Sequence, residues 1–207
     1  MGVEQDVEIW FNKGLALAKI GRGSEALVAY DRALALDARY IPAMVQKANM
    51  LASQGKTEVA LEWFGRALEI DPDSVIAWNN RGWCLRGTRR YDDAIVCFDQ
   101  ALRVNPSFAR SWVNRANVLV LKARYAEAVA DADRALGLDP TIADAWLPKA
   151  LALEELQRTA EAIQAYSAYL EANPAEAASN DSPIRSRLRK LQDKSRKPGL
   201  FGLFGKR

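Results

Sequence analysis

Residues 78–82 read WNNRG, and close variants of this stretch recur along the chain. They are WFNKG at 10–14, MVQKA at 44–48, WVNRA at 112–116 and WLPKA at 146–150. Each variant begins 34 residues after the one before it, so the sequence divides without gaps into repeated units. Periods of this length are typical of proteins built from stacked helix pairs. The units are 7–40, 41–74, 75–108, 109–142 and 143–176.

Two apolar stripes are present in every unit when its positions are counted from its first residue. Position 4 is large, position 8 is glycine or alanine, and position 11 is leucine. The residues at position 4 are Trp10, Met44, Trp78, Trp112 and Trp146. Because positions 4, 8 and 11 are spaced i, i+4 and i+7, they lie on one face of a helix. Positions 20, 24 and 27 repeat this spacing, so each unit is predicted to contain a helix A followed by a helix B.

Turn-forming residues mark the ends of these helices. GRGS at 21–24 and SQGKT at 53–57 interrupt the periodicity between helix A and helix B. Position 32 is proline in every unit except the first: Pro72, Pro106, Pro140 and Pro174. Proline cannot continue helix B, and it also disfavours a helical residue before it. Pro148 falls inside the predicted helix A of the fifth unit, so we expect that repeat to be irregular.

This pattern resembles the tetratricopeptide repeat (TPR) family over residues 7–176. The resemblance implies an all-α fold, a right-handed superhelical solenoid whose A helices line a concave channel. Three positions depart from the family pattern: Met44, Ala132 and Tyr169. A two-helix unit cannot bury its apolar face alone, so neighbouring units must stack.

Beyond the repeats we expect a linker at 177–182, a basic capping helix at 183–197 and a flexible tail at 198–207. Ser182 is the expected N-cap of the capping helix, and Pro183 occupies its first position. Ile184, Leu188 and Leu191 form an apolar stripe suited to closing the end of a solenoid.

A row of carboxamides at position 6 is the main candidate for function: Asn12, Gln46, Asn80 and Asn114. Position 6 is about 200° around helix A from the buried stripe, so it is predicted to face the channel. Asn49 and Asn117 at position 9, and Asn79 at position 5, lie beside this row. A carboxamide both donates and accepts, so this ladder suits the backbone of an extended peptide. Such asparagine ladders occur in peptide-binding members of the TPR family, which this row resembles. The alternative is that the row is solvated and reflects only the common ancestry of the repeats.

Other channel residues are predicted to complete the site. Phe11, Trp83 and Val113 would supply apolar contacts, and Arg110 would supply a charge. The carboxylate clamp of chaperone-binding family members is matched by Asn49, Asn80 and Arg110. However, Val45 and Asn114 stand where that clamp has a lysine and an arginine. A carboxylate without these cations would be costly to bury, so we expect no clamp.

A cation occupies position 7 in every unit: Lys13, Lys47, Arg81, Arg115 and Lys149. We expect their stems to lie across the helix interface and their heads to reach solvent or carboxylates such as Asp37, Asp71 and Asp139. The alternative is a phosphate-binding stripe.

Composition argues against an enzyme. The 207 residues include no histidine, which removes the commonest general base, and no catalytic motif is recognisable. Cys84 and Cys97 have no metal-ligand spacing and are expected to be buried, so no metal or cofactor is predicted. Because residues 1–10 are acidic and no window of about eighteen residues is uniformly apolar, we expect neither a secretory signal nor a membrane-spanning segment. We expect a cytoplasmic location, with peripheral attachment to the inner membrane face as the alternative.

Charge is distributed unevenly along the sequence. Residues 183–207 contain nine cations and one anion, a net charge of +8, whereas the preceding residues carry −5. Within the tail, Leu200, Phe201, Leu203 and Phe204 precede Lys206 and Arg207. Three interpretations of the tail are open: it contacts an anionic membrane, it docks into a partner or a second copy, or it is a solubilising segment. A nucleic-acid partner is not expected.

The sequence therefore predicts a non-catalytic scaffold that binds an extended peptide in its concave groove through the Asn ladder. The alternative is a membrane-peripheral adaptor that uses the basic, Leu/Phe-tipped tail.

Overall fold

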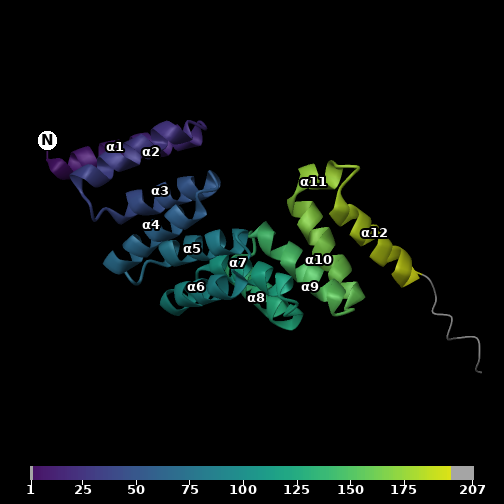
Figure 1. Ribbon diagram of the computed structural model, residues 1–207. Helices are drawn as coiled ribbons and strands as arrows, with labels where there is room; N and C mark the ends of the chain where they lie inside the picture. The colour runs from purple at the N-terminus through teal and green to yellow at the C-terminus, as the bar shows by residue number, and fades with distance from the viewer. Residues whose placement is uncertain (1, 197–207) are drawn as a thin grey trace, which may run out of the picture. The chain divides into compact units, whose positions relative to one another are not determined.

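The computed structural model describes residues 2–196, and each regular element in that range is a helix (Figure 1). The predicted all-α solenoid fold is confirmed. The first three repeats contain α1 (Val3–Lys19) with α2 (Gly23–Leu36), α3 (Ile41–Ser53) with α4 (Thr57–Ile70), and α5 (Val75–Gly87) with α6 (Tyr91–Val104). The fourth contains α7 (Ala109–Leu121) and α8 (Tyr125–Leu138). The fifth contains a 3-10 turn, η1 (Ala143–Ala145), followed by α9 (Trp146–Glu155) and α10 (Thr159–Ala172).

The small residue at position 8 allows helix A to approach the large side chain on helix B. A Cβ added to Gly14 would lie 2.4 Å from the ring of Tyr30, and one added to Gly82 would lie 2.6 Å from Phe98. Both distances are far below van der Waals contact, so these sites have no room for a larger residue. Tyr30 and Phe98 are themselves fully buried, which places the core of each hairpin at this crossing.

The turn between helices A and B has the same backbone conformation in all five repeats. Position 15 has a positive φ in each: 79° at Gly21, 78° at Gly55, 62° at Arg89, 57° at Ala123 and 58° at Gln157. A left-handed residue after the last helical turn lets the chain reverse direction. Only glycine adopts this conformation without steric cost, so the last three turns contain a strained residue.

Pro148 does not kink the middle of a helix. The first helix of the fifth repeat opens as η1, and α9 begins at Trp146, which places Pro148 in the first turn of α9. The N–H groups of a first turn have no intrahelical partner, so proline costs no hydrogen bond there. The expected irregularity is therefore a shortened α9 with a 3-10 entry.

After the repeats the chain forms α11 (Pro174–Ala178) and α12 (Pro183–Arg196). Helix α11 occupies the first two residues of the expected linker. The Ser182 hydroxyl accepts a hydrogen bond from the Arg185 N–H, so Ser182 caps α12. The apolar stripe of α12 packs on α10, with Leu191 buried. The tail at 198–207 lies outside the described residues.

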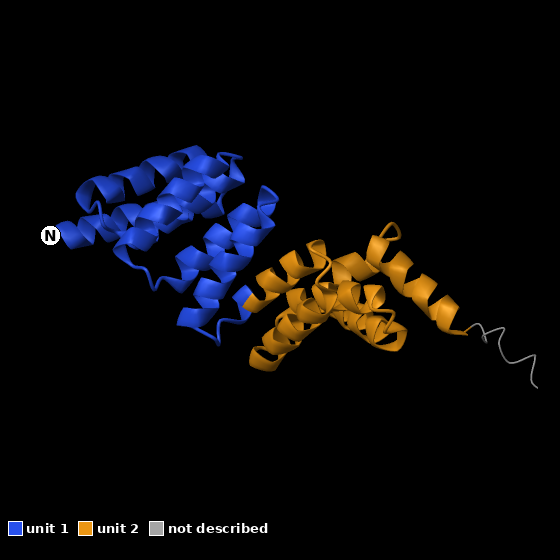
Figure 2. Cartoon of the chain, turned by 60° about the horizontal axis from the view of Figure 1, so that its bottom comes forward, with its two compact units in different colours: residues 1–111 blue, residues 112–207 orange. Residues whose placement is uncertain are grey.

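The chain divides into two compact units, residues 1–111 and 112–207 (Figure 2). In the first unit, α1 contacts α3 and α3 contacts α5, so three successive A helices lie side by side. In the second unit, α8 packs against α9, and Val113, Ala135 and Ala145 form a buried cluster. No described helix combines the length and the hydropathy that a membrane span requires.

Candidate peptide-binding surface

A chain of hydrogen-bonded carboxamides runs across the A helices of the first unit. The Ser111 hydroxyl donates to Asn79 Oδ1 (3.0 Å), and Asn79 Nδ2 donates to Asn80 Oδ1 (3.0 Å). Asn80 Nδ2 then donates to Asn49 Oδ1 on α3 (3.2 Å), and Asn49 Nδ2 lies 3.5 Å from Gln46 Oε1. The bonds therefore connect residues of the second, third and fourth repeats in one donor direction.

The members of this carboxamide chain differ in their access to solvent. Asn79 is 2% exposed, so its side chain is part of the core and not of a surface that a peptide could contact. Gln46, Asn49 and Asn80 are half-buried. A carboxamide has two N–H donors, and the bonds above use one from Asn49 and one from Asn80. Each of these side chains therefore keeps a second donor while its orientation is held by its neighbours.

Exposed apolar residues flank the carboxamide chain on α5. Ile76 and Trp83 are each 48% exposed, and with Asn80 they are spaced i, i+4 and i+7. The three side chains therefore share one face of α5. The Arg86 guanidinium lies 6.0 Å from the centroid of the Trp83 ring. Ile76 was not among the predicted site residues, although position 2 lies on the same helical face as position 6 and this spacing indicates it.

The remaining predicted residues of the first unit have different environments. Asn12 on α1 and Arg110 on α7 are exposed. Phe11 is half-buried because its ring packs edge-on against Tyr40, with centroids 5.4 Å apart, and also lies near Tyr30. Phe11 therefore offers only part of its ring to a ligand.

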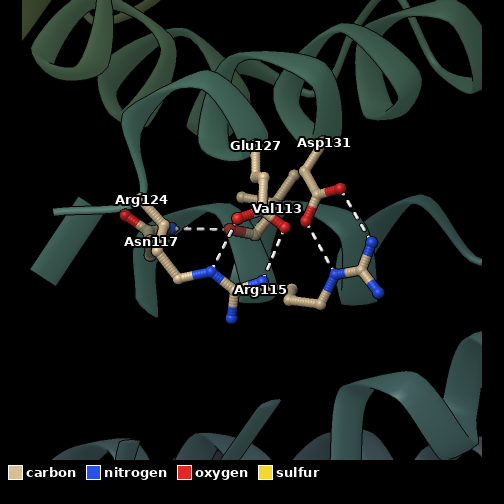
Figure 3. A network of polar contacts seen from close by, with 6 residues as sticks. All are labelled: Val113, Arg115, Asn117, Arg124, Glu127 and Asp131. Atoms are coloured by element: carbon tan, nitrogen blue, oxygen red, sulfur yellow. Dashed lines mark hydrogen bonds and ion pairs between the residues drawn. The ribbon is translucent and has the colours of Figure 1, made fainter. Parts of the chain in front are cut away.

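In the second unit, the predicted residues on α7 are engaged with the protein itself. Val113 is 4% exposed and lies in the buried cluster, so it is not available for apolar contact with a peptide. Asn117 Nδ2 donates to the Val113 carbonyl oxygen (3.0 Å), a bond within its own helix (Figure 3). Asn114 is half-buried.

The position 7 cations stack on tryptophan rings. The cationic groups of Lys13, Arg81, Arg115 and Lys149 lie 4.6, 5.7, 4.7 and 5.1 Å from the centroid of the tryptophan three residues earlier. The second repeat has Met44 at that place, and its Lys47 instead lies 3.8 Å from the ring of Trp63 on α4. Cation–π contact at these distances contributes about 0.5–2 kcal/mol.

The carboxylate partners of these cations are not the ones expected from sequence. Lys47 pairs with Asp31, Arg115 with Asp131, and Lys149 with Asp133, all on B helices (Figure 3 for Arg115). The aspartates named earlier accept backbone N–H bonds instead: Asp37 from Arg39, Asp71 from Asp73 and Asp139 from Thr141. Lys47, Arg115 and Lys149 therefore connect an A helix to a B helix, whereas Lys13 and Arg81 contact a tryptophan of their own helix.

The two thiols lie in unreactive environments. Cys84 and Cys97 are both buried, and burial raises the pKa of each. The pKa of Cys97 reaches about 11. Because the thiolate is the nucleophile and the metal ligand, these cysteines are poor candidates for either role.

A buried tyrosine joins the last repeat to α12. The Tyr166 hydroxyl donates to Glu154 Oε2 (2.5 Å), and Arg187 Nη1 donates to the same oxygen (3.0 Å). Burial, followed by the bond to the Glu154 carboxylate, raises the pKa of Tyr166 above its ordinary value. Arg187 thus fastens α12 to α9 and α10.

Sequence comparison with family models matches most of the chain. One model described as "Tetratricopeptide repeat" matches residues 3–41 and 122–177, a second with that description matches 75–108, and one described as "TPR repeat" matches 48–83. The chain belongs to the tetratricopeptide repeat family. A comparison of this TPR protein with curated proteins found no match.

Solved structures with the same fold include PilF from Pseudomonas aeruginosa, which is 21% identical with a TM-score of 0.82 over 94% of this chain and 88% of that one. PilW, a type IV pilus biogenesis factor, is 21% identical with a TM-score of 0.81 over 91% of this chain and 87% of its own. YrrB, described as a TPR protein with an unusual peptide-binding site, is 18% identical with a TM-score of 0.65 over 90% of this chain and 93% of its own. At these identities the comparisons establish the fold.

Proposed function

We propose that this TPR protein is a non-catalytic interaction scaffold that binds an extended peptide segment of a protein partner. The observation that carries the proposal is the face of α5 on which Ile76 and Trp83, both half-exposed, flank Asn80. A half-exposed tryptophan beside hydrogen-bonding groups is a typical anchor in protein recognition, because a partner can bury the ring and satisfy the polar groups together.

The carboxamides supply the backbone contacts in this proposal. Gln46, Asn49 and Asn80 are half-buried and orient one another, so little side-chain freedom remains to be lost on binding. Their remaining donors suit the carbonyl oxygens of an extended peptide, whose side chains would contact Ile76 and Trp83. YrrB, which has this fold, is described as having a peptide-binding site, and this supports a peptide as the ligand. The proposal is confined to the first unit, since Val113 is buried and Asn117 bonds to its own helix in the second. Within the first unit it leaves out Asn79, which is buried.

The test begins with a selection of displayed random peptides on the intact protein, followed by calorimetry with a selected peptide. Trp83→Ser and Ile76→Ser should each weaken binding about tenfold or more, because a buried anchor typically contributes 2 kcal/mol or more. Val96→Ser is the matched control, since Val96 is a half-exposed aliphatic residue (55%) of the same unit on α6. Equal loss in the control, or unchanged affinity in both α5 variants, would reject the surface.

The carboxamide chain is best tested at its end. Asn80→Ala would remove the Asn80 Oδ1 acceptor of the buried Asn79 side chain, at a cost of about 1–3 kcal/mol in stability. A loss of binding in that variant could then result from weakened folding. Among residues 2–196, the Gln46 side chain receives only the long contact from Asn49, so Gln46→Ala should weaken peptide binding with little change in stability. Retained affinity in Gln46→Ala would remove the carboxamides from the site.

Attachment to an anionic membrane is a second candidate, supported by α12. Arg189, Lys190, Lys194 and Arg196 are exposed and form no ion pair within residues 2–196. A basic helix of this kind is attracted to anionic lipid by about 1 kcal/mol per cation near the surface. Co-sedimentation with phosphatidylserine vesicles should fall in a chain with Arg189→Glu and Lys190→Glu. Binding that is equally strong in this variant would reject the α12 contribution.

A further inference from the structure

An open hollow of about 530 Å3 lies at the amino-terminal end of the first unit, where α1 begins and α2 ends. Its apolar lining includes Val3, Leu36 and Tyr40. Val3 is 61% exposed and Leu36 is 42% exposed, so the hollow presents apolar surface that the described residues leave uncovered. Clustered exposed apolar side chains of this kind mark an interaction site more often than isolated ones do.

The rim of the hollow is acidic. Glu4, Glu8 and Asp37 line it together with the apolar residues. Among residues 2–196, none of these carboxylates forms an ion pair. Burial raises the pKa of Tyr40, and the charges of Glu8 and Asp37 raise it further, as expected where negative charge is concentrated. A ligand for this site must therefore be apolar and cationic.

The segment of the sequence that follows α12 has that chemistry. Residues 197–207 read KPGLFGLFGKR, with four large apolar residues, three cations and no carboxylate side chain. The apolar residues form a doubled Leu-Phe-Gly, and Lys197, Lys206 and Arg207 flank them. The apolar centre matches Val3, Leu36 and Tyr40, and the flanking cations match the three carboxylates of the rim.

We propose that the hollow binds residues 197–207 of a second copy of this chain. Such a contact is heterologous, because the surface used on one copy differs from the segment used on the other. After one such contact, one copy still has a free segment and the other still has a free hollow, so further copies can add head to tail. Attraction between exposed charges is screened by salt, so the association should weaken at high ionic strength.

The first test measures binding of the labelled peptide KPGLFGLFGKR to the intact protein, with fluorescence anisotropy as the signal. The variant Glu4→Lys with Glu8→Lys should bind the peptide about tenfold more weakly, because it reverses two rim charges. The matched control is Glu62→Lys with Glu69→Lys, which reverses two exposed charges on α4, away from the hollow. Equal affinity in the rim variant and the control would overturn the proposal.

The second test measures the self-association of the full chain by sedimentation velocity over a range of concentrations. The wild type should form larger species as concentration rises, whereas a chain with Phe201→Ser and Phe204→Ser should stay at its smallest size. This variant leaves the first unit unchanged, so misfolding of the hollow cannot explain its result. Association that persists in this variant, or a wild type that stays at its smallest size at every concentration, would overturn the intermolecular contact.

A charge exchange completes the experiment. Chains with Lys206→Glu and Arg207→Glu, mixed with chains carrying Glu4→Lys and Glu8→Lys, should associate where each variant alone does not. Failure of the mixture to associate would contradict the pairing of these charges. If the segment instead binds only to phosphatidylserine vesicles and the hollow binds no peptide, the membrane reading replaces this one. Ile76→Ser should leave self-association intact, which separates the hollow from the peptide-binding face of α5.

Discussion

Replacement of Arg115 by methionine is the sharpest test of how the two helices of a repeat are held together. The Arg115 guanidinium makes two parallel bonds to Asp131, Nε to Oδ2 at 2.7 Å and Nη2 to Oδ1 at 2.8 Å (Figure 3). The side chain of Asp131 is only 7% exposed and that of Arg115 is 22% exposed. The pair connects helix A to helix B of the fourth repeat, where Ala132 stands in place of the large residue at position 24.

The expected loss follows from the burial of the carboxylate. Removal of one partner of a buried ion pair costs about 3–5 kcal/mol, because the other charge stays away from water without compensation. Arg115 is partly exposed and methionine keeps some of its packing, so we expect about 2–4 kcal/mol for Arg115→Met. This includes the cation–π contact with Trp112, about 0.5–1 kcal/mol.

The matched control is Arg124→Met in the same unit. Arg124 pairs with Glu127 three residues later, and their side chains are 44% and 56% exposed. The hydrogen bond from Arg124 lowers the pKa of Glu127, but water screens this pair, so its loss should change stability far less. The stability of both variants is measured by urea unfolding, monitored by circular dichroism. Amide hydrogen exchange in α7 and α8 then reports the stability of the fourth repeat alone, so the comparison does not require the two compact units to unfold together.

A double variant decides the physical cause. Arg115→Met with Asp131→Leu removes both charges, and it should recover much of the loss because the buried carboxylate is removed together with its guanidinium partner. The reasoning is refuted if Arg115→Met is no more destabilising than Arg124→Met. It is also refuted if the losses of the two single variants simply add in the double variant.

Three further predictions concern the turns, the hairpin crossing and the thiols. Ala123→Gly should raise the midpoint of urea unfolding, by up to about 1 kcal/mol in stability, because Ala123 has a left-handed backbone; Gly55→Ala should lower it. Gly82→Ala should cost about 1–3 kcal/mol in thermal or urea unfolding, because its Cβ would overlap the Phe98 ring, and an unchanged melting temperature would contradict this crossing. Native Cys97 should react slowly with iodoacetamide at pH 8, since its pKa is raised from 9.0 to about 11. The buried neutral thiol of Cys97 should contribute fully to stability below pH 9, and this contribution should be lost as pH rises through 11. The difference in unfolding free energy between the wild type and Cys97→Ala should therefore fall between pH 9 and 11, and a rise would contradict the raised pKa.

Much of the fold can be read from the sequence, because the repeated unit is specified by local rules. The spacing of positions 4, 8 and 11 predicts one helical face, and the fully buried Tyr30 and Phe98 meet Gly14 and Gly82 as that face requires. Even the irregular entry to the fifth repeat was indicated by Pro148. These features depend on backbone geometry within a few turns of helix, which residue type alone constrains.

The candidate site was harder to predict, because helical periodicity gives the direction of a side chain but not its neighbour. Positions 5 and 6 were both expected on the channel wall, yet Asn79 is in the core and Asn80 is half-exposed. The same limit applies to the position 7 cations. Their partners Asp31, Asp131 and Asp133 are set by the crossing of separate helices and not by sequence distance.

The sequence by itself determined the repeat length, the helix pairs, the small-to-large crossing and the basic character of α12. Only the tertiary structure decided which carboxamides bond to one another, which apolar residues stay exposed on α5, and where an acidic hollow opens beside α1. The physical reason is that helix formation depends on contacts within about four residues, whereas a surface is made by side chains that packing brings together from several helices.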